Sequence, residues 1–108
     1  MISEGKTSIP VELERLTVLF KLLADSTRLN ILLRLAAGEQ NVTELCKILK
    51  LPQPTVSHHL GLLRTSNVIT NRRSGKQMIY SLNGRLGADA RELVVEHDSL
   101  VLRVGPVS

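Results

Sequence analysis

The chain has 108 residues, enough for about one folded domain, and 43% of them are hydrophobic. Its longest apolar runs are far too short to span a bilayer, and its single cysteine excludes an internal disulfide. These features predict one cytoplasmic domain over residues 1–108, in a reducing compartment and without membrane association. Residues 1–10 lack an apolar signal core and are expected to be disordered or frayed.

Positive charge is concentrated in one part of the sequence. The segment from Leu45 to Ala88 contains seven basic residues and no acidic ones, whereas the remainder contains seven basic and ten acidic residues. A basic surface of this kind is typical of proteins that displace counterions from nucleic-acid phosphates; the alternative is a basic face that serves only solubility. Phe20 and Tyr80 are the only aromatic residues, which favours a duplex over single strands that need stacking side chains.

Two amphipathic helices are predicted in the first third of the chain. Residues 11–24 carry apolar residues at the spacing of one helical face. Residues 26–37 repeat this pattern, with Asp25 or Ser26 available as the N-cap and Gly38 as a stop signal.

A short third helix and a fourth helix follow. Asn41 and Glu44 resemble a capping box for the third helix, and Pro52 lies just beyond its end. The fourth helix is predicted over residues 54–65, because proline is well tolerated in the first turn. The apolar side of this helix is predicted to contain Val56, Leu60 and Leu63, with His59 at its border. Its opposite side is mostly small or polar and has no evident role within the chain.

The pattern changes after Asn67. Alternating residues on both sides of an interruption at residues 74–76 predict a β-hairpin with a basic tip. Residues 85–103 then predict a last helix, because apolar residues and one histidine recur at spacings of three and four, which suits packing against another helix. This stripe comprises Leu86, Ala90, Leu93, His97, Leu100 and Val104.

The order of these elements predicts a winged helix-turn-helix: a mainly α fold with a small β-hairpin, whose reading head is centred on residues 43–65. In this fold the second helix of the motif enters the major groove. The side chains expected to read base edges are Gln53, Thr55, Ser57 and His58. Those expected to contact phosphates, with the hairpin tip near a minor groove, are Lys50, Arg64, Arg72, Arg73 and Lys76.

Several short motifs together resemble the ArsR/SmtB family of bacterial transcriptional repressors over roughly residues 15–100. These motifs are Leu23-Ala24-Asp25-Ser26-Thr27-Arg28, Glu44-Leu45-Cys46, Pro54-Thr55-Val56-Ser57-His58-His59-Leu60 with Leu63-Arg64, Arg73-Ser74-Gly75-Lys76 and Tyr80-Ser81-Leu82. The resemblance implies a homodimer joined by the first and last helices, bound to a partly palindromic operator and released by an inducer. The stripe on the last helix favours the same dimer, although packing within one chain is the alternative. The expected interface residues are Leu13, Leu16, Phe20, Leu93, His97 and Leu100.

The metal sites of this family are incomplete here. The family's thiolate site has two cysteines, whereas Cys46 stands alone and is expected to act as a small buried hydrophobe. At the second family site, near the end of the chain, only His97 remains of the ligands, and zinc needs about four. We therefore expect no metal and no cofactor, and the inducer is unknown. A non-standard metal or redox sensor using His97 or Cys46 remains an alternative.

Other functions find less support in the sequence. Enzymatic activity is not expected, because no nucleophile and base, phosphate-binding glycine loop or carboxylate cluster occurs at a workable spacing. The main rival is a winged helix that binds another protein, since a fold does not determine its function. The acid-free segment favours DNA.

Overall fold

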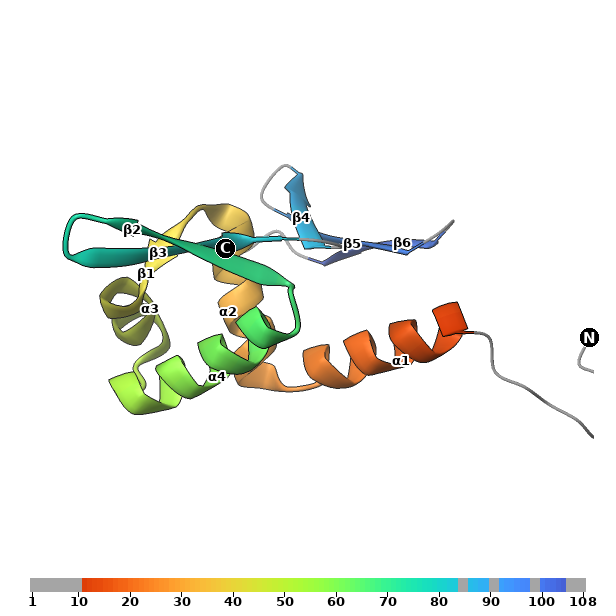
Figure 1. The fold of residues 1–108 in the computed structure, drawn as a ribbon, viewed down its shortest axis with the longest axis horizontal. Helices are drawn as coiled ribbons and strands as arrows, with labels where there is room; N and C mark the ends of the chain where they lie inside the picture. The colour runs from red at the N-terminus through yellow and green to blue at the C-terminus, as the bar shows by residue number, and fades with distance from the viewer. Residues whose placement is uncertain (1–10, 84–85, 90–91, 98–99, 105–108) are drawn as a thin grey trace, which may run out of the picture.

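The computed structural model describes residues 11–83, 86–89, 92–97 and 100–104, which form four helices followed by two small antiparallel sheets (Figure 1). The helices are α1 (Val11–Leu23), α2 (Ser26–Ala37), α3 (Val42–Leu49) and α4 (Gln53–Thr65). The strands of the first sheet are β1 (Gln40–Asn41), β2 (Ile69–Ser74) and β3 (Gln77–Leu82). Those of the second are β4 (Leu86–Asp89), β5 (Glu92–His97) and β6 (Leu100–Val104).

The start of α2 is fixed by the predicted cap. The Asp25 carboxylate accepts a hydrogen bond from the Arg28 backbone N–H at 3.0 Å, which satisfies a donor that has no partner within the helix. This hydrogen bond, helped by the positive charge of Arg28, holds the pKa of Asp25 below its ordinary value. At the other end, the Gly38 N–H donates to the Leu35 carbonyl at 3.1 Å, so the helix ends where the sequence predicted.

The helix-turn-helix is built by local signals in the chain. The predicted capping box is present at α3: the Glu44 N–H donates to the Asn41 side chain at 2.8 Å, and the Asn41 N–H donates to the Glu44 carboxylate at 2.9 Å. Lys50 ends α3 in the left-handed conformation, with φ of 57°. α4 begins one residue earlier than expected, with Pro52 at the N-cap position.

The predicted hairpin forms the wing, and it belongs to a three-stranded sheet of order β1-β3-β2. Its register pairs Ile69 with Leu82 at the base and Ser74 with Gln77 at the tip. Ile69 is buried, whereas the side chains of β2 near the tip are exposed. The two-residue strand β1, which the sequence did not predict, pairs with β3 and joins the wing to the start of α3.

The prediction of a last helix over residues 85–103 is wrong, because the described residues of this segment form β4, β5 and β6 in that order in one sheet. A spacing of four is an even number, so it keeps residues on one face of a strand as well as on one face of a helix. Val95 and Leu102 fill same-face positions between the residues of the predicted stripe, and the register pairs Val95 with both Leu86 and Leu102. Apolar residues at every second position, with several valines, favour strands. A dimer cannot be joined through a helix that this segment does not form.

One hydrophobic core connects these elements. Residues of α2, α3, α4 and β2 are buried together with residues of the second sheet. The buried core residues are Leu19, Ile31, Leu32, Leu35, Ala36, Leu45, Val56, Leu60, Leu63, Val68, Ile69, Leu86, Leu93 and Val95. In the part of the chain that the structure describes, no helix is long and apolar enough to cross a membrane.

The core position of α4 is tested by truncating Leu60, which is fully buried. We expect Leu60→Ala to lower the free energy of unfolding by about 2–5 kcal/mol, because it removes buried methyl groups and leaves a cavity. Urea denaturation measures the change. The matched control is Leu62→Ala, since Leu62 is exposed on the same helix, and its effect should stay below about 1 kcal/mol. Equal losses for the two variants would contradict the orientation of α4.

Candidate nucleic-acid interface

The packing of α4 determines which of its side chains are available to a partner. Val56, Leu60 and Leu63 are buried as predicted, so the other side of the helix faces outward. The four predicted base-reading residues lie on the first two turns, three exposed and Ser57 half-buried: Gln53, Thr55, Ser57 and His58. Their amide, hydroxyl and imidazole groups can donate or accept hydrogen bonds, as the reading of base edges requires.

Two of these side chains already contact each other. The Gln53 Nε2 donates to the Ser57 Oγ at 3.0 Å, one helical turn further along. This hydrogen bond orients the Gln53 amide across the start of α4. Because both groups are accessible, the amide keeps a donor and an acceptor for a base edge.

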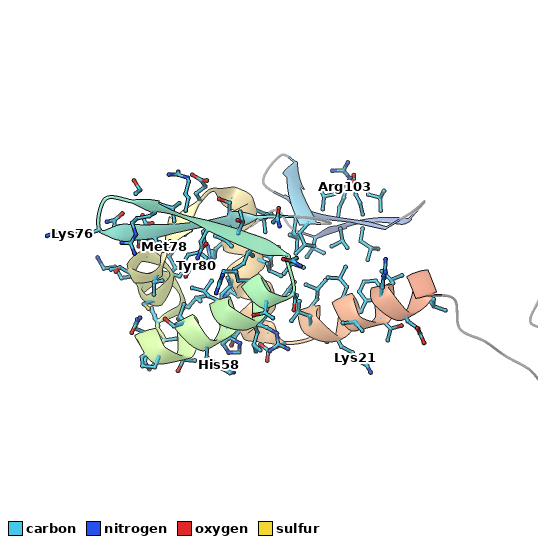
Figure 2. The ribbon with its side chains drawn as sticks, viewed as in Figure 1. Lys21, His58, Lys76, Met78, Tyr80 and Arg103 are labelled. Atoms are coloured by element: carbon cyan, nitrogen blue, oxygen red, sulfur yellow. The ribbon has the colours of Figure 1, made fainter. Side chains whose placement is uncertain are left out.

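The adjacent histidines have different environments. His58 is exposed and points away from the body of the protein (Figure 2), whereas His59 is half-buried at the border of the core, as predicted. Their rings meet edge to face, with centroids 5.6 Å apart. The His59 Nδ1 is buried and has no hydrogen-bond partner. His58 is therefore the histidine that a partner can reach.

Basic side chains flank both ends of α4. Lys50 lies in the turn before the helix and Arg64 in its last turn, and both are exposed. Cations at these places can contact phosphates on either side of a groove occupied by the helix.

The wing carries further positive charge at its tip. Gly75 has a φ of 64° and is the first of the two residues that connect β2 to β3, which fits a type II′ turn. Arg73 and Lys76 are exposed, and Lys76 projects from the end of the hairpin (Figure 2). The tip of the hairpin and the beginning of α4 lie at the same end of the molecule (Figure 1). The structure thus places a polar helix face and a basic tip where one elongated polyanion can reach both.

Arg72 differs from the other predicted phosphate-binding residues. Its Nη2 donates to the Glu39 Oε1 at 2.8 Å, and the Ser81 Oγ donates to the other carboxylate oxygen at 2.7 Å. These hydrogen bonds, that of Ser81 first and that of Arg72 second, lower the pKa of Glu39. Sequence reasoning missed Glu39, because no local pattern indicates that it meets residues 33 and 42 positions further along the chain.

Comparison with known proteins identifies the family. Residues 25–71 match the profile described as "Bacterial regulatory protein, arsR family", which covers the helix-turn-helix and the start of the wing. The arsenical resistance operon repressor of Escherichia coli is 44% identical over 79 residues, which are 72% of this chain and 68% of that protein. The chain belongs to the ArsR family. It is therefore a transcriptional regulator with a DNA-binding fold, as its motifs predicted.

Solved structures of similar proteins support the same fold for this ArsR-family chain. HlyU from Vibrio cholerae superposes with a TM-score of 0.68 at 32% identity and covers 70% of this chain and 83% of its own. A homodimeric winged helix-turn-helix DNA-binding domain from Mycobacterium bovis superposes with a TM-score of 0.63 at 28% identity, covering 75% of this chain and 77% of its own. The predicted winged helix-turn-helix is confirmed.

The thiolate chemistry of ArsR-family metal sites does not fit this chain. Cys46 is half-buried on α3 and is the sole cysteine of the sequence. Soft ions such as arsenite prefer several sulfur ligands. Among the residues that the structure describes, no group of three His, Cys, Asp or Glu side chains could hold an ion.

The predicted dimer residues fall into three groups. Leu13 and Phe20 are exposed on α1 and Leu16 is half-buried there, so this stripe is open to a partner. Leu93 is fully buried within its own chain and is occupied as a core residue. His97 and Leu100 lie in β5 and β6, and their side chains are outside the described part.

Two glycines of the candidate interface should respond in opposite ways to the same substitution. Gly75→Ala places a side chain at a positive φ, so we expect it to destabilise the turn by roughly 1–2 kcal/mol and to weaken the hydrogen-exchange protection of the hairpin amides. Gly61→Ala on α4 meets open space and should raise the free energy of unfolding by about 0.5–1 kcal/mol. Unchanged protection in the Gly75 variant would contradict the left-handed turn.

Proposed function

We propose that this ArsR-family protein is a homodimeric repressor that binds double-stranded DNA at a partly palindromic operator. The observation that carries the proposal is the placement of the exposed polar face of α4 and the basic wing tip at one end of the molecule (Figure 1). The absence of acidic residues between Leu45 and Ala88 supports it, since no carboxylate of that segment opposes the phosphates. The E. coli relative is itself named as an operon repressor.

The two parts of this surface have different tasks. α4 enters the major groove, where the side chains of its first two turns read base edges: Gln53, Thr55, Ser57 and His58. The cations around it bind phosphates and set affinity more than sequence choice: Lys50, Arg64, Arg73 and Lys76.

The second copy is proposed from exposed apolar surface on α1. Leu13 is 48% and Phe20 38% exposed in the single chain. Burying such side chains is the main driving force of association. The similar M. bovis domain is described as homodimeric. A two-fold dimer presents two reading heads, which is why the operator is expected to be partly palindromic.

No effector is assigned in this proposal. The E. coli relative is named for arsenical resistance, but a single thiolate does not supply the sulfur ligands that arsenite prefers. Arsenical sensing is therefore not carried over to this chain.

DNA binding is tested by titrating salt in a mobility-shift assay, with a duplex that the protein selects from a randomised pool. We expect affinity to fall by orders of magnitude between about 50 and 200 mM salt, because each phosphate contact releases counterions. Absent or salt-insensitive binding would refute the proposal and favour a winged helix that binds another protein.

The division of tasks within the surface is tested by two alanine variants. Arg73→Ala should weaken binding to selected and random duplexes alike and reduce the salt slope by about 0.9. His58→Ala should cost about 1–3 kcal/mol on the selected duplex only, because it removes a base contact. Equal effects of both variants on the two duplexes would contradict this assignment.

The dimer is tested by placing a charge in the apolar stripe of α1. Phe20→Glu should shift the protein from dimer to monomer in sedimentation at micromolar concentration, because the carboxylate would have to be buried in the interface. Val18→Glu is the control, since Val18 is exposed on α1 but lies about 160° around the helix from Phe20. A Phe20 variant that stays dimeric would exclude this stripe.

A further inference from the structure

Arg72 and Arg73 are neighbours in sequence but lie on opposite faces of the wing. In the β2–β3 register Arg72 pairs with Ile79 and Arg73 with Met78, and directly paired residues share a face. Met78 lies on the side of the hairpin that faces α3 and α4, the side on which the buried Ile69 also falls (Figure 2). Arg73 therefore shares a face with the residues that pack toward the helices, and Arg72 points to the outer face.

One carboxylate bridges both strands of the wing on that outer face. Glu39 lies between α2 and β1, and its two oxygens accept hydrogen bonds from Arg72 in β2 and from Ser81 in β3. Both hydrogen bonds are short and have a charged acceptor, and such bonds are stronger than neutral ones. The base of the hairpin is thereby connected to the end of α2.

A second connection lies closer to the tip. The Asn41 Nδ2 donates to the Gln77 Oε1 at 3.2 Å, while the Asn41 Oδ1 caps α3 by accepting from the Glu44 N–H. Gln77 is the first residue of β3 and pairs with Ser74 at the turn. The wing is thus joined to α2 through Glu39 and to α3 through Asn41.

We infer that Glu39 and Arg72 are positioning residues: their ion pair fixes the direction of the wing relative to the helix-turn-helix, and Arg72 is not a phosphate ligand. This inference rests on the proposed DNA-binding function and reassigns one of the arginines that the sequence predicted to bind phosphate. The wing phosphates are left to Arg73 and Lys76.

The contrary assignment gives Arg72 to the DNA and makes Glu39 a competitor for it. Under that assignment, removing the carboxylate would free a cation and strengthen binding. Under ours, removing it loosens the wing and weakens binding. The two side chains are 58% and 49% exposed, so the pair is screened by water and the expected effect is modest.

The test measures the affinity and salt slope of four variants on the selected duplex. We expect Glu39→Gln and Arg72→Gln each to lower affinity about two- to five-fold with an unchanged slope, and the double variant to lose no more than the weaker single variant. Arg73→Gln should reduce the slope by about 0.9, the value for one lost phosphate contact. Stronger binding by Glu39→Gln, or a reduced slope for Arg72→Gln, would overturn the inference.

Glu44→Gln controls for the change of charge. It removes one negative charge close to Glu39, yet glutamine retains the hydrogen bond of the capping box. It should bind at least as well as the unmodified protein. If Glu44→Gln and Glu39→Gln alter affinity equally, net charge explains both and the positioning role is excluded.

Two measurements without DNA separate this inference from the proposed function. In NMR titration the pKa of Glu39 should rise toward its ordinary value when Arg72 is replaced by glutamine, because the charged partner is lost. Amides of β2 and β3 should exchange faster in Glu39→Gln, with the unfolding midpoint of the core unchanged. If the unmodified protein binds no duplex, the proposed function fails while these measurements still decide the role of the ion pair. An unchanged Glu39 pKa and unchanged exchange would refute that role.

Discussion

The burial of one side of α4 is the constraint on which the candidate interface depends. Val56, Leu60 and Leu63 are each almost fully buried against the rest of the core, and this fixes the rotation of the helix about its axis. A different rotation would turn the polar residues of the first two turns away from solvent. The apolar side of α4 therefore determines which side chains can meet a base edge, although none of the buried residues contacts DNA itself.

The wing depends on a second, weaker set of interactions. Its hydrophobic base is held by Ile69, which is buried, whereas its outer half has few apolar contacts and extends from the body of the protein (Figure 1). Backbone pairing fixes which residues share a face, and the polar connections of Glu39 and Asn41 fix where the hairpin lies relative to the helices. This combination suits a surface that must hold cations at a definite distance from a reading helix.

Local signals in the sequence predicted most of the fold. The caps at Asp25 and Asn41 and the apolar side of α4 involve residues at most seven apart, and each is present as expected. The segment after residue 85 was predicted wrongly, because a spacing of four does not distinguish a helix face from a strand face, and Val95 and Leu102 decide between them only once strand partners are known. The role of Glu39 could not be predicted, because its partners come from distant parts of the chain. The assignments of base-reading and phosphate-binding residues remain predictions from residue type and position.

The central claim is that the start of α4 and the tip of the wing form one surface that contacts duplex DNA. NMR chemical-shift mapping of the protein on addition of the selected duplex tests it most directly. The account predicts that amides at residues 53–58 and 73–76 are perturbed together, at the same ratio of duplex to protein. Perturbations confined to α1 and the second sheet, or limited to one of the two segments, would contradict it.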